Sequence, residues 1–140
     1  MLRDCALKYY FEANYNCAET IVRAGNEYYG LGLHDQDMKL VAAYGAGIQT
    51  GNTCGALLSG AAILSMKYVE QRAHESADIK PVTTLLVRRF KEKLGGLDCK
   101  EVKPRFFQPG IRCRHTVETA CDVLESVIDE YEATRKETNA

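Results

Sequence analysis

Apolar residues recur at helical spacing along almost the whole of this 140-residue chain. Repeats of three and four residues favour amphipathic helices, and the alternation typical of a half-buried strand is absent over any useful length. Glycine and proline then interrupt the pattern at Gly45–Gly51, Gly95–Gly96 and Pro109–Gly110. We therefore predict an all-α fold: one domain over residues 1–140, a bundle of about five to seven helices with a glycine-rich loop before the central helix.

Capping residues and breakers set the predicted helix boundaries. We expect helices over about 2–14, 17–29, 36–44, 54–73, 81–94, 99–103 and 113–132. Asp35 is the expected cap of the third helix, and Pro81 suits the first turn of the fifth because its missing N–H is not needed there. The remaining tail, from about residue 133, is polar and is expected to fray.

The stretch from Gly45 to Gly60, GAGIQTGNTCGALLSG, joins a flexible loop to the start of the central helix. Its glycines permit positive φ angles and a close approach of other backbone. Thr53 offers a hydroxyl to cap the helix, which places Cys54 at the first helical position. A thiol there lies at the positive end of the helix dipole, which favours the thiolate form.

The same arrangement recurs at three other cysteines. Asn16–Glu19 and Asp98–Glu101 each contain the residues of a capping box, which puts Cys17 and Cys99 at the first position of a helix. The last long helix opens at Cys113. Four cysteines are therefore expected at helix starts, where a fold can bring them together. The other two, Cys5 and Cys121, lie on apolar helix faces and are expected in the core.

Composition narrows the classes of function. Eighteen Lys and Arg balance nineteen Asp and Glu, so neither nucleic acid nor an anionic membrane is an expected partner. No apolar run reaches the roughly 18 residues of a membrane span, and we expect a soluble, cytoplasmic protein without membrane insertion. Structural disulfides are rare in such a compartment. The six cysteines contain no C-x-x-C pair, so a site must be assembled by the fold.

The negative charge of four converging thiolates must be neutralised, because two thiolates 4 Å apart repel by about 4 kcal/mol at an effective dielectric near 20. An iron–sulfur cluster would use four cysteine ligands and N–H donors, for which Gly47, Gly51 and Gly55 are candidates. Zinc accepts the same four sulfurs in a tetrahedral site. A thiol–disulfide mechanism needs two, with Cys54 as the nucleophile and another cysteine resolving.

The chain also resembles a known family, the redox-active C_GCAxxG_C_C proteins, over about residues 14–130. The resemblance rests on Asn16–Ala18, Gly51–Ala56 leading to Lys67–Tyr68, Cys99, and Cys113 with Val117. Ser59 stands where the family has glycine, but no thiol is lost. The family implies a redox role for the four cysteines. Similar sequence occurs in a domain of split-Soret cytochromes with a suggested iron–sulfur site, but haem-attachment motifs are absent here.

These observations lead to one hypothesis and two alternatives. We expect a small redox protein in which Cys17, Cys54, Cys99 and Cys113 bind one iron–sulfur cluster for electron transfer. The first alternative is a cluster-free thiol–disulfide oxidoreductase with Cys54 as nucleophile, and the second is a zinc-stapled helical interaction module. The expected partner is a redox protein or a small-molecule thiol, and a homodimer is possible.

Overall fold

A computed structural model describes residues 1–139 of the chain. Within them, short π and 3₁₀ turns and isolated β-bridges join seven α-helices, and no strand is present. The helices are α1 (Leu2–Leu7), α2 (Cys17–Tyr29), α3 (Asp35–Met38), α4 (Gly55–Tyr68), α5 (Ile79–Leu94), α6 (Cys99–Phe106) and α7 (Arg114–Asn139). The predicted all-α fold, with a glycine-rich loop before α4, is confirmed. That the chain forms a single domain stays a prediction.

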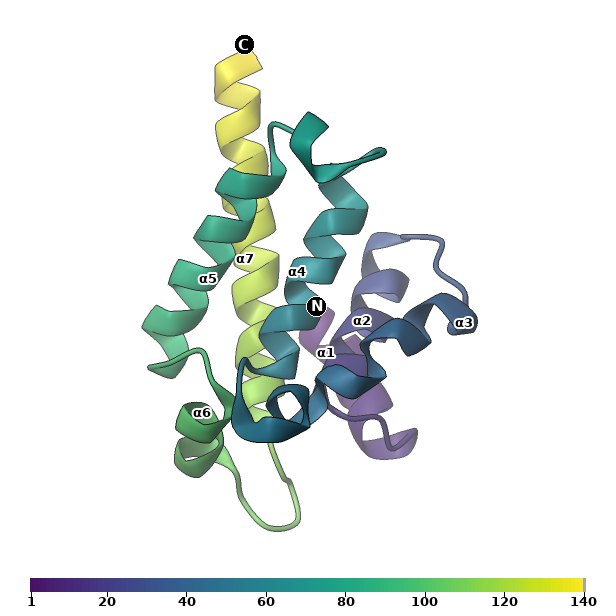
Figure 1. The fold of residues 1–140 in the computed structure, drawn as a ribbon, viewed down its shortest axis with the longest axis vertical. Helices are drawn as coiled ribbons and strands as arrows, with labels where there is room; N and C mark the ends of the chain where they lie inside the picture. The colour runs from purple at the N-terminus through teal and green to yellow at the C-terminus, as the bar shows by residue number, and fades with distance from the viewer. Residues whose placement is uncertain (140) are drawn as a thin grey trace.

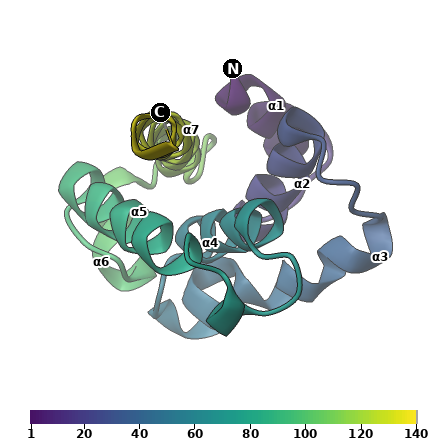
Figure 2. The same cartoon turned by 90° about the horizontal axis from the view of Figure 1, so that it is seen from above.

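Five of these helices pack side by side in a closed ring. Helix α1 contacts α2 and α7, α4 contacts α2 and α5, and α5 contacts α7, as the view along the long axis shows (Figure 2). Their apolar faces bury side chains such as Leu64 of α4, Phe90 of α5 and Leu124 of α7. Removal of this apolar surface from water is the main stabilising contribution to the ring.

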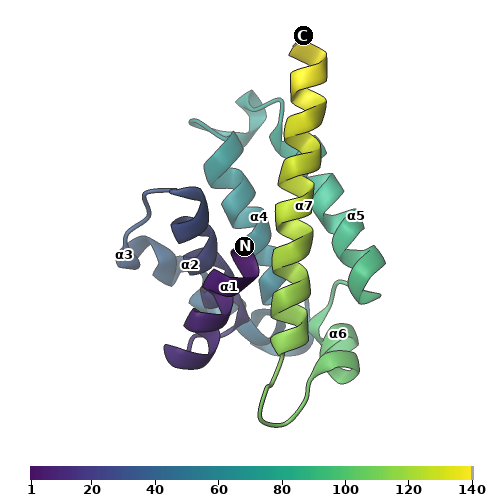
Figure 3. The same ribbon diagram turned by 180° about the vertical axis from the view of Figure 1, so that it is seen from behind.

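The starts of three helices gather at one end of the molecule. Figure 1 shows α4, α6 and α7 beginning at its lower end, and Figure 3 shows the α6–α7 loop projecting from the same end. A turn over Gly47–Gly51 with several positive φ angles lies there as well, three residues before α4. The sequence places cysteines at these helix starts, so the topology brings them to one region.

Both predicted capping boxes are confirmed. At the start of α2, the Asn16 side chain accepts the Glu19 N–H at 2.9 Å, and the Glu19 carboxylate accepts the Asn16 N–H at 3.1 Å. The same reciprocal pair begins α6. As predicted, Cys17 and Cys99 therefore occupy the first position of their helices.

Other boundaries differ from the predicted ones. The cap of α3 is His34 rather than Asp35. Helix α4 ends at Tyr68, several residues early, where the Ser76 hydroxyl donates to the Tyr68 carbonyl at 2.7 Å and holds the turn that follows. Pro81 lies in the first turn of α5 as predicted, but at its third position, because the helix begins at Ile79.

The polar end of the chain is helical. Helix α7 continues to Asn139, so the expectation that the tail frays from residue 133 is wrong for residues 133–139, and Ala140 lies outside the described residues. Side chains near this end are tied down: the Tyr131 hydroxyl donates to Asp78 at 2.6 Å, and Arg135 pairs with Asp78 at 3.7 Å. These contacts fasten α7 to the connection between α4 and α5.

Among the described residues, no helix combines the length and the apolar character that crossing a membrane requires.

Candidate functional site

Four cysteines line one cavity of about 180 Å³, named here the cysteine cavity. They are the four that the sequence places at helix starts: Cys17, Cys54, Cys99 and Cys113. The rest of the lining is Tyr10, Asn16, Ala46, Val102, Lys103, Phe107, Arg112 and Thr116. The volume corresponds to about six water molecules at roughly 30 Å³ each, which is more than one metal ion fills.

Main-chain hydrogen bonds hold two of the cysteine-bearing helix starts together. The Cys54 N–H donates to the Leu97 carbonyl at 2.8 Å, and the Cys99 N–H donates to the Asn52 carbonyl at 2.6 Å. Each bond joins the residues before α4 to those around the start of α6. The positions of Cys54 and Cys99 are thus fixed relative to each other by backbone.

The same contact explains why one predicted cap is wrong. Thr53 pairs with Asp98 in an isolated antiparallel bridge and does not cap α4. Cys54 itself occupies the N-cap position, with φ −56° and ψ 131°, one residue before the predicted position. Pairing with a distant segment has therefore overridden a local capping preference.

Tyr10 anchors the fourth cysteine. Its hydroxyl accepts the N–H of Cys113 at 3.1 Å. The Cys113 carbonyl accepts the Val117 N–H at 3.0 Å, so Cys113 is the N-cap of α7 rather than its first residue. The Arg112 guanidinium donates to the Tyr10 carbonyl at 2.9 Å and lies 4.2 Å from the centre of its ring. The segment after α1 therefore supports one wall of the cavity.

Two glycines permit the close approach of the cysteines. A β-carbon at Gly55 would lie 3.0 Å from the Cys17 sulfur, and one at Gly47 would lie 2.7 Å from the β-carbon of Cys99. Gly51 has a φ of +79° but more space, since Lys100 would be 3.5 Å away. None of the three is among the residues lining the cavity. Their use as N–H donors to a cofactor stays a prediction.

Backbone N–H groups point at two of the sulfurs. The N–H groups of Ala46, Ala18 and Ala56 act to lower the pKa of Cys17, and those of Ala56 and Leu57 act to lower the pKa of Cys54. Ala56 and Leu57 belong to the first turn of α4, and the Leu57 N–H also donates to the Cys54 carbonyl at 3.1 Å. Such donors stabilise negative charge on sulfur.

Burial nevertheless outweighs these donors in the cofactor-free protein. Burial, followed by the adjacent Cys17 thiol, raises the pKa of Cys54 to about 12, and Cys54 is only 5% exposed. Burial also raises the pKa of Cys17 and of Cys113. The expectation that the helix start favours a Cys54 thiolate is therefore wrong, because losing water costs more than the helix dipole returns.

We expect iodoacetamide to label Cys54 slowly in the reduced, cofactor-free protein. With a pKa near 12, its thiolate fraction at pH 8 is about 10³-fold lower than that of an ordinary cysteine. Mass spectrometry after timed alkylation, with and without urea, measures the ratio. Equal labelling rates in the folded and unfolded chain would restore Cys54 as a reactive nucleophile.

One buried hydroxyl in the cavity has no partner. Thr116 is 3% exposed and lines the cavity one turn after Cys113, and within residues 1–139 its oxygen makes no hydrogen bond. A buried polar group without a partner is costly, so it indicates a bound group that completes its hydrogen bonding. Sequence reasoning missed Thr116, although its spacing of three residues from Cys113 on one helix was a usable signal.

Positive charge lies beside the cysteines. Lys103 and Arg112 line the cavity and act against the burial that raises the pKa of Cys113. Ala46, also in the lining, has a φ of 52°, a left-handed conformation that costs an alanine roughly 1–2 kcal/mol. Strain of this kind often accompanies functional sites.

Within the described residues, no three Cys, His, Asp or Glu side chains are grouped closely enough to hold a metal ion as they stand. The cysteine sulfurs would therefore have to move closer together for a metal centre to bind in this cavity.

The remaining candidates lie elsewhere. His115 is exposed, and its ring centre lies 4.7 Å from that of Phe106, outside the lining of the cysteine cavity. Cys121 is fully buried and Cys5 partly buried, and neither lines the cavity. Burial raises the pKa of both thiols.

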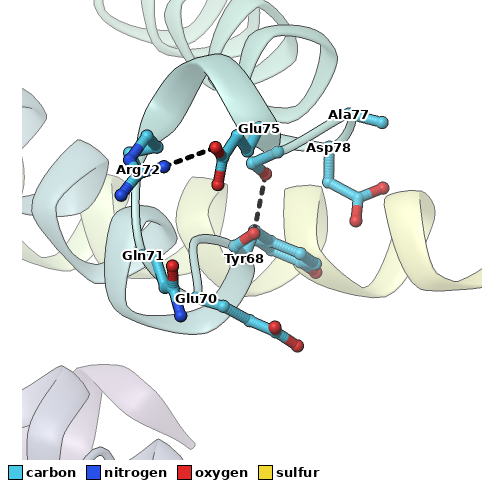
Figure 4. A pocket seen from close by; sticks show the side chains of 8 residues that line it. Tyr68, Glu70, Gln71, Arg72, Glu75, Ala77 and Asp78 are labelled. Carbon is cyan, nitrogen blue, oxygen red and sulfur yellow. Dashed lines mark hydrogen bonds and ion pairs between the residues drawn. The ribbon is translucent and has the colours of Figure 1, made fainter.

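A second hollow, of about 500 Å³, lies between α4 and α5 (Figure 4). Two contacts join residues of its lining: an ion pair between Arg72 and Glu75, and a hydrogen bond from Ser76 to Tyr68. Its lining is polar and contains no cysteine. The cysteine cavity is therefore the candidate site for the redox role that the sequence predicts.

Comparison with known proteins gives a family match. A family model described as "Putative redox-active protein (C_GCAxxG_C_C)" matches residues 15–127, which include five of the six cysteines, all but Cys5. No curated protein and no solved structure gives a significant match. The chain belongs to the C_GCAxxG_C_C family.

Proposed function

We propose that this member of the C_GCAxxG_C_C family is an electron-transfer protein that holds one iron–sulfur cluster through Cys17, Cys54, Cys99 and Cys113. The observation that carries the proposal is the common cavity lined by these four cysteines. Four thiolates are the usual ligand set of such clusters. When bound, the cluster supplies a centre that accepts and returns single electrons.

The size of the cavity favours a cluster over a single ion. Zinc bonds sulfur at about 2.3 Å, so four sulfurs around one zinc lie close together and leave little space between them. The cavity that the four cysteines help to line has a volume of about 180 Å³, which suits a larger group. The experiment below distinguishes bound zinc from an iron–sulfur cluster.

The surroundings of the cysteines suit a centre with net negative charge. Burial raises the pKa of Cys17 and of Cys54, so these thiols are protonated when the cavity holds no cation, and binding iron would release their protons. The N–H groups at Cys17 and Cys54, and the cations of Lys103 and Arg112, then stabilise the sulfur ligands. Burial excludes water, which protects a centre of this kind from hydrolysis and strengthens each of these interactions.

Purification without oxygen tests the proposal. We expect a coloured protein with iron and acid-labile sulfide, and thiols that become accessible only after the cofactor is removed. One zinc per chain without sulfide would support the interaction module instead. A colourless, metal-free protein with a reversible disulfide would overturn the proposal in favour of a thiol–disulfide oxidoreductase.

The Thr116→Val variant tests the unpartnered hydroxyl. Valine has nearly the same shape, so in the cofactor-free protein it should raise the free energy of unfolding by about 1–2 kcal/mol, because a buried polar group without a partner is removed. In the loaded protein it removes a donor to sulfur, and the midpoint potential should become more negative. Urea titration and a spectroscopic redox titration measure the two effects.

These two effects separate a role toward the cofactor from a merely structural one. A Thr116→Val variant that is more stable but keeps the wild-type potential would show that the hydroxyl does not contact the redox centre. Thr119→Val on the same helix is the matched control, because Thr119 lies outside the cavity lining and should leave the potential unchanged.

A further inference from the structure

We propose that the face formed by residues 97–114 docks an acidic electron-carrier protein over the cysteine cavity. This inference rests on the proposed function, since it names the partner of the same site. The segment comprises α6 and the loop to α7, and it carries two of the four cavity cysteines, Cys99 and Cys113. We call it the basic face.

The charge of the chain is unevenly distributed. Residues 97–114 contain five basic residues, Lys100, Lys103, Arg105, Arg112 and Arg114, and two acidic ones, Asp98 and Glu101. Five minus two gives a net charge of +3, whereas the whole chain has −1, so all other residues together carry −4. The average charge, which gave no sign of a charged partner, hides two local excesses: the one beside the cavity, and one on α5, where five basic residues against one acidic residue give +4. Only the first of them adjoins the cysteine cavity.

Most of this positive charge is not neutralised within the protein. Among the described residues, Lys100, Lys103, Arg105 and Arg112 form no ion pair, and Arg114 pairs with Glu118. Lys100, Lys103 and Arg105 are exposed. Unpaired cations on a surface act over about one Debye length, some 8–10 Å at physiological salt.

The cysteine cavity adjoins the surface at this face. A shallow hollow of about 660 Å³ shares Ala46, Cys99, Lys103 and Phe107 with the cavity, and Lys100 lies on its rim. Phe107 and Ile111, on the same face, are exposed by 41% and 37%. Exposed apolar side chains and unpaired cations on the same segment suit a docking surface that recognises an acidic partner.

Electron transfer explains why such a surface lies here. A buried redox centre must be approached closely by its partner, and this is the face at which the cavity adjoins solvent. Electron-transfer complexes are small and short-lived, so opposite charge contributes mainly to the rate of encounter. A small molecule would gain little from cations spread over a helix and a loop, which favours a protein partner.

Charge reversal tests the proposal with the loaded protein and a purified acidic [2Fe–2S] ferredoxin as the probe. We expect Lys100→Glu with Arg105→Glu to lower the second-order rate of electron exchange at least about tenfold at low salt. The difference should shrink as salt is added. The matched control is Arg88→Glu with Lys91→Glu on α5, which changes the net charge equally at exposed, unpaired sites.

Stopped-flow absorbance measures these rates, and cytochrome c serves as a basic probe of opposite charge. Equal slowing by the two double variants, or exchange that is faster with cytochrome c than with ferredoxin in the wild type, would overturn the docking proposal. A second readout is independent of the cofactor: NMR titration of the cofactor-free protein with ferredoxin should perturb signals of residues 97–114 first.

The two proposals fail in different ways. If the purified protein holds no redox centre, the proposed function is wrong, and the NMR titration still decides whether the face binds an acidic protein. If the redox centre is present and charge reversal on α6 leaves the rate of electron exchange unchanged, the proposed function stands and the docking proposal is wrong.

Discussion

Serine in place of Cys17, Cys54, Cys99 or Cys113 is expected to lower cofactor occupancy by at least about tenfold, since each change removes a ligand outright. Serine hydroxyls do not ionise near neutral pH and are weak ligands for iron. The four cysteines line one cavity, so each variant should show the loss. Iron and sulfide per chain, together with the visible spectrum after oxygen-free purification, measure occupancy.

Cys5 and Cys121 provide the controls within the same chain. Neither lines the cavity, so Cys5→Ser and Cys121→Ser should keep the cofactor. Cys121 is fully buried, so a hydroxyl there should lower the free energy of unfolding by roughly 1–3 kcal/mol. Cofactor occupancy is therefore compared at a temperature at which every variant is folded. Equal losses at all six cysteines would contradict the four-cysteine site.

The helical parts of the fold were accessible from sequence because their signals are local. A capping box lies within four residues, so Asn16 and Glu19 fix the start of α2 without reference to the rest of the chain. The apolar spacing of α7 likewise identifies its buried face. The expectation that the cysteines converge needed one further assumption. It was that several helix starts lie at the same end of the bundle.

The errors arise where distant segments interact. Thr53 has the local features of a cap, but its backbone pairs with Asp98, and this displaced the start of α4 by one residue. The thiolate prediction for Cys54 failed for a similar reason. The helix dipole is a property of the local sequence, whereas the burial that raises the pKa depends on which other elements cover the sulfur.

The loop before α4 is the least predictable part of the site. Ala46, Ile48 and Gln49 all have positive φ angles, between 52° and 59°, although none is of a residue type that favours them. Only Gly47 between them fits its conformation without strain. The surrounding contacts must therefore impose this turn, and no local pattern indicates that Ala46 lines the cavity.

Gly47→Ala is the substitution at this loop with the largest expected effect on stability. A left-handed alanine costs roughly 1–2 kcal/mol, and its β-carbon would lie 2.6 Å from the Asn52 nitrogen and 2.7 Å from the Cys99 β-carbon. Overpacking adds about 1–3 kcal/mol, so the free energy of unfolding should fall by about 2–5 kcal/mol. Because the clash falls on Cys99, cofactor occupancy should fall too.

Gly51→Ala separates the clash from the strain. Its φ is +79°, but the new β-carbon would meet only the Lys100 β-carbon, at 3.5 Å, so the cost should be the strain of about 1–2 kcal/mol, with occupancy retained. Urea unfolding of both variants and their iron content give the comparison. Similar stability losses at the two glycines, or full occupancy in Gly47→Ala, would mean that Cys99 tolerates displacement. The close approach at Gly47 would then stabilise the loop without being needed to position Cys99 for the cofactor.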